Sequence, residues 1–299
     1  MPEERKALIS KIQHFSTADG PGIRTTVFLK GCSMKCPWCH NPETLVPGPV
    51  LVYYRRSCRG CGLCAAVCPR GAHFMTEEGL HGFDRSKCAA CGKCVKSCLG
   101  NALFLSGKLM TAGEVFSECM KDEELYRAAP GGVTVSGGEP ALSADFAAEL
   151  AGMLKDAGVG VILDTAGGAP LDSFKKLLPC VDEFYYDVKA CRGEDLARWT
   201  GGDIETVSRN LRFLKENGAR IRIRIPVIPG YNSGREYALL MKEYLESLGC
   251  GDLPCDLLPF HRFGFAKYEG LDTENPCALI EPCGGSVIEE MKEVLRGGE

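Results

Sequence analysis

Residues 24–39 read RTTVFLKGCSMKCPWC, a run of strand-forming residues that ends in three cysteines. β-branched and aromatic side chains favour a strand here. Five more runs of this kind follow along the chain, separated by helical patterns. The expected strands cover residues 24–30, 133–136, 159–164, 183–188, 220–227 and 255–260. This alternation is typical of parallel strands joined by crossover helices, so we expect an α/β fold.

The expected helices lie between these strands and after the last one. They cover residues 111–128, 144–157, 171–178, 204–217, 235–248 and 286–296. The first of them opens with Thr111 and Glu114, the spacing of a capping box. Six strand–helix units are fewer than the eight of a closed barrel, so we expect an open, partial (β/α)6 TIM-like barrel.

Composition excludes several classes of protein. The chain has 299 residues, 45% of them hydrophobic and 25% charged, with a formal net charge of -4. This balance gives no overall attraction to nucleic acid or to an anionic membrane, and no apolar run is long enough to span a bilayer. The polar N-terminal segment MPEERKALIS has no secretory pattern, so we expect a cytoplasmic protein.

Eighteen cysteines are far more than chance would give, and in a reducing compartment grouped thiols usually bind metal. Eleven of them form three tight groups before residue 100. The other seven cysteines are scattered along the chain, and we interpret them as small buried hydrophobes. They are Cys119, Cys180, Cys191, Cys250, Cys255, Cys277 and Cys283. The last four of these, called the late cysteines, are the ones to examine for metal binding.

The first group has the spacing CxxxCxxC at Cys32, Cys36 and Cys39. Three thiolates are one ligand short of the four that hold a cubane iron–sulfur cluster, so one iron would keep an open coordination site. The alternative is a zinc site completed by His40. Zinc would leave the Gly-Gly-Glu strand end at 137–139 without an explanation.

The other two groups, at 58–68 and 88–98, both have the spacing CxxCxxCxxxC. This is the bacterial two-cluster ferredoxin pattern, in which the fourth cysteine of each run binds the other cluster. Pro69 completes the first motif, whereas Leu99 replaces the second proline. Zinc knuckles are the alternative. The predicted ligand sets are Cys58, Cys61, Cys64 and Cys98 for one cluster, and Cys68, Cys88, Cys91 and Cys94 for the other.

We therefore expect two domains. Residues 1–50 and 105–299 would form the partial barrel, and residues 51–104 a bacterial-type 2[4Fe-4S] ferredoxin-like insert. The insert is too small to bury much apolar surface, so its fold should depend on its clusters.

Polar residues recur where the expected parallel strands end, which is the edge that carries active sites in such folds. One group follows each of four strands. These groups are 136–140 (SGGEP), Asp164 and Thr165, 187–189 (DVK), and His261. Their shared placement indicates one site more strongly than any single motif does.

The combination of CxxxCxxC with GGEP resembles the radical S-adenosylmethionine superfamily. The opening IQHFSTADGPGIRTTVFLKGC resembles glycyl-radical-enzyme activating enzymes, and the resemblance covers nearly the whole chain outside the insert. Later matches are DTxG at 164–167, DxK at 187–189, RxxxxPG at 224–230 and LPFHxxGxxKY at 258–268. Two-cluster inserts occur in a subset of these enzymes, including activases of 4-hydroxyphenylacetate decarboxylase, benzylsuccinate synthase, choline lyase and some diol dehydratases.

The resemblance implies a role for each matching residue. Cys32, Cys36 and Cys39 would hold the catalytic cluster, and its open iron would bind the methionine moiety of S-adenosylmethionine. Asp164, Thr165 and Asp187 would lie where relatives hold a monovalent cation. The other residues expected to contact the cofactor are Trp38, His40, Gly137, Gly138, Glu139, Val188, Lys189, Arg224 and His261.

The leading hypothesis is an oxidoreductase that activates a glycyl radical enzyme. It would use three [4Fe-4S] clusters and a protein electron donor such as flavodoxin or ferredoxin, and would act as a monomer on the partner's C-terminal glycyl loop. One alternative is a radical enzyme that modifies another peptide or a metabolite, favoured if the late cysteines held iron. A second alternative is a plain electron carrier. The CxxxCxxC group and the barrel-like chain argue against it.

Overall fold

An eight-stranded sheet dominates the computed structural model, which describes residues 4–296. Six of its strands are parallel and lie side by side in chain order. They are β2 (Arg24–Leu29), β8 (Gly132–Gly137), β9 (Gly160–Thr165), β10 (Glu183–Asp187), β11 (Ile221–Val227) and β12 (Cys255–Pro259). The expected α/β fold with a central parallel sheet is confirmed.

Two strands that the sequence analysis did not expect extend this sheet. β1 (Lys6–Ser16) pairs antiparallel with β2, and β7 (Lys108–Thr111) pairs antiparallel with β1. The two strands lie on the side of β2 away from β8. The sheet therefore begins before the cysteine-bearing strand, and β2 lies inside the sheet with neighbours on both sides.

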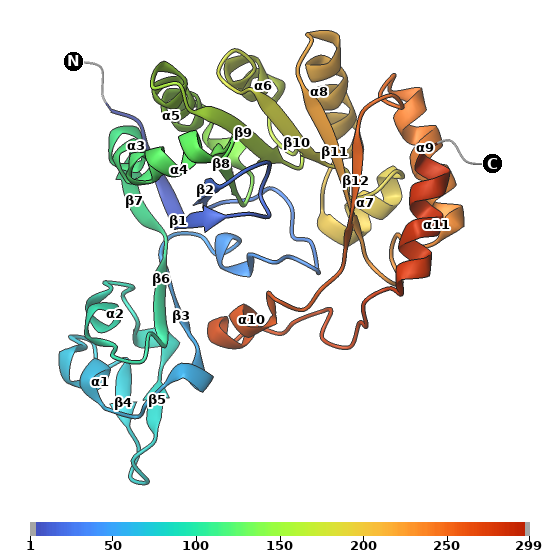
Figure 1. Cartoon of the computed structure of the whole chain (residues 1–299). Helices are drawn as coiled ribbons and strands as arrows, with labels where there is room; N and C mark the ends of the chain where they lie inside the picture. The colour runs from blue at the N-terminus through green and yellow to red at the C-terminus, as the bar shows by residue number, and fades with distance from the viewer. Residues whose placement is uncertain (1–3, 297–299) are drawn as a thin grey trace.

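Helices cover the outer face of the sheet, and Figure 1 shows α5, α6, α8 and α9 along it. The predicted capping box is confirmed: Thr111 Oγ1 accepts from Glu114 N at 3.1 Å, and Glu114 Oε2 accepts from Thr111 N at 2.8 Å. The expected helix over 111–128 is interrupted at 120–122 by a 3-10 turn. The helices are α3 (Ala112–Cys119), α4 (Glu123–Ala128), α5 (Ala144–Asp156), α6 (Leu171–Leu177), α7 (Gly193–Thr200), α8 (Ile204–Glu216), α9 (Arg235–Ser247), α10 (Phe265–Leu271) and α11 (Gly285–Leu295).

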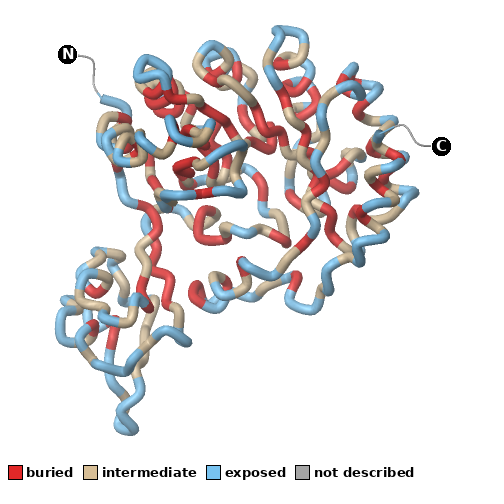
Figure 2. Tube along the Cα trace, in the orientation of Figure 1, coloured by how far each residue is buried: buried red, intermediate tan, exposed pale blue. Residues whose placement is uncertain are grey.

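The main core lies between the strands and the inner faces of these helices, where Figure 2 shows buried chain. β11 illustrates the pattern that puts it there. Its sequence IRIRIPV alternates buried and half-buried positions, so isoleucines face the helices while arginines face the inside of the curved sheet. No helix within residues 4–296 has the length and hydropathy that crossing a bilayer requires.

A small lobe lies between β2 and α3 in the sequence and projects from the sheet in Figure 1. Its stem is the antiparallel pair of β3 (Val50–Tyr53) and β6 (Leu103–Ser106). Its tip is the hairpin of β4 (His73–Met75) and β5 (His81–Phe83). Two short helices, α1 (Leu63–Val67) and α2 (Lys93–Ser97), pack against each other in it. Short 3-10 turns occupy 55–57 and 85–87 in the lobe, and 42–44 and 140–143 in the rest of the chain.

Candidate functional site

The CxxxCxxC cysteines lie in the loop that follows β2, at the carboxyl edge of the parallel strands. Backbone N–H groups of the loop point at two of the sulfurs: Met34 N donates to Cys32 Sγ and Asn41 N to Cys39 Sγ, both at 3.4 Å. Burial raises the pKa of Cys32 to about 11 and that of Cys39 to about 12. Such thiols need a cationic ligand to become thiolates near pH 7, so this donor set fits a metal cluster.

Gly137, the last residue of β8, and Gly138 after it let the loop pack closely on the strand ends. Gly138 N donates to Leu29 O at 2.9 Å, and Glu139 N donates to Gly31 O at 2.8 Å. A Cβ on Gly138 would lie 2.0 Å from the Gly31 carbonyl oxygen. A side chain is therefore excluded at this position, and Gly138 seats the start of the cysteine loop.

The Glu139 side chain is buried and fully engaged inside the protein. It accepts hydrogen bonds from Thr165 Oγ1 at 2.6 Å, Ala166 N at 2.9 Å and Ala141 N at 3.1 Å. Burial raises its pKa, and these three donors oppose that shift. Glu139 and Thr165 thus join the ends of β8 and β9, and the Thr165 hydroxyl is directed at Glu139.

Four charged side chains meet inside the sheet, two of them at the ends of β9 and β10, one just after β10 and one in the middle of β11. Arg224 Nη1 lies 3.0 Å from Asp164 Oδ1, and its Nε lies 3.7 Å from Asp187 Oδ1. Lys189 Nζ donates to Asp187 Oδ2 at 2.9 Å. All four side chains are less than one-fifth exposed. Two carboxylates and two cations therefore converge at one rim. The strand-end pattern predicted that Asp164, Asp187 and Lys189 would lie together, whereas the family resemblance selected Arg224.

The two carboxylates of this quartet are perturbed in opposite directions. Burial raises the pKa of Asp164, and Arg224 only partly offsets it. Burial acts the same way on Asp187, but Lys189 and Arg224 together hold its pKa below the ordinary value. Asp187 Oδ1 is buried and has no hydrogen-bond partner within the described chain. The Val188 side chain points into the main core, which leaves only its backbone for the site.

Trp38 and His40 point to different neighbours. Trp38 is buried, and its ring centroid lies 5.1 Å from that of Tyr231 and 6.3 Å from that of Trp199. Its Nε1 finds no hydrogen-bond partner among residues 4–296. His40 instead stacks on His261, with ring centroids 4.1 Å apart. The motif match selected Trp38 and His40 but missed Trp199 and Tyr231, because no sequence pattern links these two residues to the loop.

Helix α10 holds the cysteine loop from the C-terminal part of the chain. Lys267 Nζ donates to Asn41 Oδ1 at 2.7 Å and to Glu43 Oε1 at 2.8 Å. Tyr268 OH donates to Cys39 O at 2.9 Å. Both α10 residues belong to the LPFHxxGxxKY motif, from which the sequence analysis selected only His261. The motif residues 258–268 therefore hold the cysteine loop in place, and they also provide His261, which stacks on His40.

The same helix also contacts the small lobe. Asp272, directly after α10, accepts from Arg55 Nη2 at 2.8 Å and from Arg85 Nη2 at 3.1 Å. Leu271 packs against Val50 and Val52 of β3. One short helix thus ties the lobe and the cysteine loop together.

Replacing Lys267 by Met should lower the free energy of unfolding by about 2–3 kcal/mol, because it leaves the buried Glu43 carboxylate without its cation. Urea unfolding under anaerobic conditions measures the change. Lys292→Met is the matched control, since its partner Glu289 is largely exposed and such pairs contribute little. Equal, small effects of the two substitutions would contradict this account of α10.

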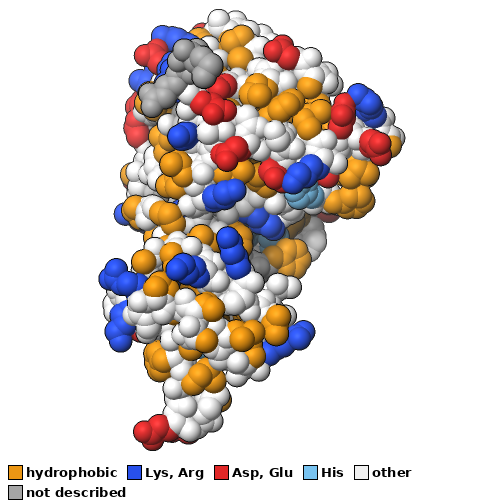
Figure 3. All heavy atoms as spheres, turned by 90° about the vertical axis from the view of Figure 1, so that its left-hand side faces the viewer, with side chains coloured by type: hydrophobic (Ala, Val, Ile, Leu, Met, Phe, Trp, Pro, Cys, Tyr) orange, Lys and Arg blue, Asp and Glu red, His pale blue; other side chains and the backbone are white. Residues whose placement is uncertain are grey.

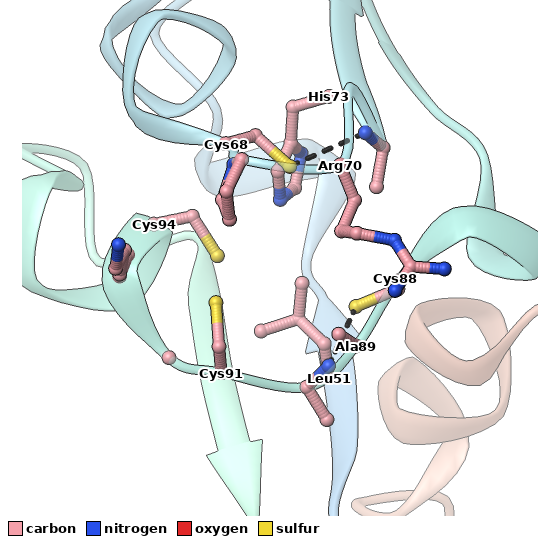
Figure 4. Close-up of a pocket in the computed structure, with 13 residues that line it drawn as sticks. Leu51, Cys68, Arg70, His73, Cys88, Ala89, Cys91 and Cys94 are labelled. Carbon is pink, nitrogen blue, oxygen red and sulfur yellow. Dashed lines mark hydrogen bonds between the residues drawn. The ribbon is translucent and has the colours of Figure 1, made fainter.

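The cysteines of the small lobe surround two cavities. One is lined by Cys58, Cys61, Cys64 and Cys98. The other is lined by Cys68, Cys88, Cys91 and Cys94, whose side chains Figure 4 shows around a common space. Each cavity thus gathers three cysteines of one run and the fourth of the other.

The late cysteines lie in different surroundings. Cys250 is buried in the main core, and Cys255 and Cys283 pack against that core. Cys277 is buried beside Trp38 in a separate apolar cluster. Their burial fits the reading as small hydrophobes.

Comparison with known proteins agrees with this geometry. Residues 18–162 match the family model "4Fe-4S single cluster domain", and residues 108–239 match "Radical SAM superfamily". A radical SAM methyltransferase from Sphaerobacter thermophilus is 15% identical with a TM-score of 0.50, over 71% of this chain and 60% of that one, and shows the fold alone.

Two relatives match almost from end to end. The benzylsuccinate synthase activating enzyme of Thauera aromatica is 39% identical over 97% of this chain and 92% of its own. The indoleacetate decarboxylase activating enzyme of Tractidigestivibacter scatoligenes is 34% identical over 97% of this chain and 94% of its own. The chain therefore belongs to the radical SAM family of activating enzymes of glycyl radical enzymes.

Proposed function

We propose that this enzyme removes a hydrogen atom from one glycine of a partner glycyl radical enzyme. The observation that carries the proposal is the CxxxCxxC loop at the edge of the sheet in a chain that matches activating enzymes over almost its full length. The bound iron–sulfur cluster supplies the electron that cleaves S-adenosylmethionine to methionine and a 5′-deoxyadenosyl radical, which abstracts the hydrogen.

The chain's own residues bind and orient the cofactor. Cys32, Cys36 and Cys39 would hold the catalytic cluster, one thiolate short of four. Lys189 and Arg224 are assigned to the methionine carboxylate as its cationic neighbours. The 137–139 backbone is assigned to the methionine amino group, and Gly138 fits this role because it seats the cysteine loop beside it. In this proposal Trp38, His40 and His261 border the adenosyl moiety.

A monovalent cation is proposed beside Asp164 and Asp187. The support is the buried Asp187 Oδ1, which lies 3.7 Å from Arg224 Nε and accepts no hydrogen bond within the described residues, so it could serve as an oxygen ligand. Thr165 fits less well, because its hydroxyl donates to Glu139 and accepts from Gly167 N at 3.0 Å.

The fold is proposed to be a partial TIM-like barrel whose open side admits the partner's C-terminal glycyl loop. Its six parallel strands run from β2 to β12 in chain order, and β12 and β7 are the two ends of the sheet. Because these ends do not pair with each other in residues 4–296, a peptide from another protein has a route to the site. We take the enzyme to be a cytoplasmic monomer.

The small lobe is proposed to be a ferredoxin-like insert over residues 51–104 that holds two [4Fe-4S] clusters. The support is the agreement between the spacing-based ligand sets and the linings of the two cavities. Sulfur ligands from both runs line each cavity, so loss of iron should unfold the lobe.

An acidic electron-donor protein, such as a flavodoxin or ferredoxin, is proposed to dock on this lobe. Residues 51–104 carry eight Lys and Arg against three Asp and Glu, in a chain whose net charge is -4. Figure 3 shows basic side chains over the body of the lobe and acidic ones at its tip. Cys61 and Cys91 are exposed, which would place the clusters close to a docked donor.

Cys61→Ser should slow glycyl radical formation roughly tenfold with a protein donor but little with a strong chemical reductant, because a small reductant reaches the catalytic cluster directly. Electron paramagnetic resonance measures both rates, in preparations whose catalytic cluster is spectroscopically intact. Equal slowing with both reductants would instead make the lobe a structural or partner-docking element.

The function itself is tested by anaerobic incubation of the reconstituted enzyme with candidate glycyl radical enzymes. A glycyl doublet in the electron paramagnetic resonance spectrum, dependent on S-adenosylmethionine, is expected with the correct partner. Cleavage of S-adenosylmethionine without a doublet in any candidate would favour a radical enzyme with another substrate.

A further inference from the structure

Two histidines lie between the two cysteine cavities of the small lobe. His73, on β4, lines the cavity of Cys68, Cys88, Cys91 and Cys94. His81, on the paired strand β5, lines the cavity of the other four cysteines. Their rings stack with centroids 5.1 Å apart, and His73 Nδ1 lies 2.9 Å from His81 Nε2. Nothing in the cysteine spacing requires a histidine at either position.

His81 also contacts sulfur. Its Nε2 lies 3.3 Å from Cys64 Sγ. Its Nδ1 lies 2.7 Å from the Tyr53 hydroxyl and 3.7 Å from Cys58 Sγ. A cluster-bound thiolate can only accept a hydrogen bond, so a nitrogen that donates to one must carry the proton. Because the contact with Cys64 is the shorter of the two, and because Nδ1 has the Tyr53 hydroxyl as a closer neighbour, we assign the His81 proton to Nε2 and make Nδ1 the acceptor from Tyr53.

The position of this proton determines the state of His73. His81 Nε2–H lies within reach of both Cys64 Sγ and His73 Nδ1, so His73 Nδ1 is an acceptor. A neutral imidazole carries a single N–H. The His73 proton is therefore on Nε2. That atom is buried and has no hydrogen-bond partner within residues 4–296, in a side chain only 3% exposed.

We propose that His73 and His81 form a hydrogen-bonded bridge that donates one N–H to sulfur in each cavity and raises the reduction potentials of both clusters. The inference rests on the proposed cluster ligands. A reduced cluster carries one more negative charge than the oxidised one, so donors to its sulfurs stabilise the reduced state. His81 acts on the cluster of Cys64, and His73 acts on the cluster in the cavity that it lines.

The test is a potentiometric titration of the reconstituted full-length enzyme, followed by electron paramagnetic resonance. His81→Phe and His73→Phe should each lower one cluster potential by about 59 mV, a tenfold change in the one-electron reduction equilibrium. The catalytic cluster, whose cysteines lie outside the lobe, is the internal reference. His81→Gln keeps an N–H donor and should restore most of the loss. Phe74→Leu is the control, because Phe74 is the exposed neighbour of His73 on β4.

A second readout follows the proton itself. Pulsed electron–nuclear double resonance in H₂O and D₂O should detect an exchangeable proton coupled to an insert cluster, and His81→Phe should remove it. Unchanged potentials in variants that retain full iron would overturn the bridge.

Two other results would overturn the bridge for different reasons. Iron near four per chain in the unaltered enzyme would mean that the lobe holds no clusters, which overturns the proposed ligand sets as well. Stoichiometric zinc bound through Cys64, His73 and His81, whose ligand atoms lie within 4.8 Å of one another, would make the histidines metal ligands and also overturn the bridge.

Discussion

Cys36→Ala should abolish reductive cleavage of S-adenosylmethionine and lower the iron content from about twelve to about eight per chain. The loss is complete because two remaining thiols cannot hold the cluster that supplies the electron. The irons proposed for the insert should stay, since their eight proposed ligands line two cavities of the lobe and include none of the CxxxCxxC cysteines. Iron and sulfide analysis, with chromatography of 5′-deoxyadenosine, measures both effects.

Cys180→Ala is the matched control for this substitution. Cys180 lies outside all three cysteine groups, packs against the main core, and has its Sγ 3.9 Å from the Lys176 carbonyl oxygen. Full activity and about twelve irons are expected for it. Persistent cleavage in Cys36→Ala, and likewise in Cys32→Ala and Cys39→Ala, would show that the catalytic cluster belongs to a different group.

Arg224→Met should weaken binding of S-adenosylmethionine roughly 10- to 100-fold, the effect of losing a charge-assisted hydrogen bond. It should also lower the free energy of unfolding by about 3 kcal/mol at neutral pH, because Asp164 and Asp187 would face each other without the guanidinium between them. Equilibrium binding and urea unfolding measure the two effects.

The cost of Arg224→Met should depend on pH in a defined direction. Burial already raises the pKa of Asp164, and loss of Arg224 raises it further. A carboxyl whose pKa is raised in the folded state is protonated at low pH and does not lower the free energy of unfolding there. That free energy falls as the pH rises through the raised pKa, because folding then buries a charge. The variant should therefore be closest to the unaltered enzyme at low pH and furthest from it above the raised pKa of Asp164.

Arg222→Met provides the comparison on the same strand and the same face. Arg222 pairs at 3.5 Å with Glu183 and with Asp256, and its side chain is one-third exposed. Water can replace much of that interaction, so a small and nearly pH-independent change is expected. A similar pH profile for the two variants would mean that the buried quartet is not what Arg224 stabilises.

Local sequence predicted the parallel strands well because each has its own apolar or β-branched residues. Strands β8 to β12 lie close to the bounds expected from β-branched and apolar residues, and the polar residues that follow them mark the carboxyl edge. The same reasoning missed β1 and β7, whose pairing is antiparallel and whose positions depend on β2. It also missed α10, because seven residues give too short a pattern.

The cysteine chemistry could be predicted because ligand spacing is a local property. CxxxCxxC and the two CxxCxxCxxxC runs define three thiolate groups with no knowledge of the fold. Membership of the activating enzymes likewise follows from contiguous motifs, which the near full-length relatives bear out.

The sequence by itself thus determined the reaction class, the parallel sheet and the cysteine groups, since each depends on residues close together along the chain. Only the tertiary structure decided which distant side chains meet. It placed Arg224 between Asp164 and Asp187, directed Lys267 of α10 to Glu43, and stacked His73 on His81. Such contacts depend on how strands and helices pack in three dimensions, and no periodicity or spacing in the chain encodes them.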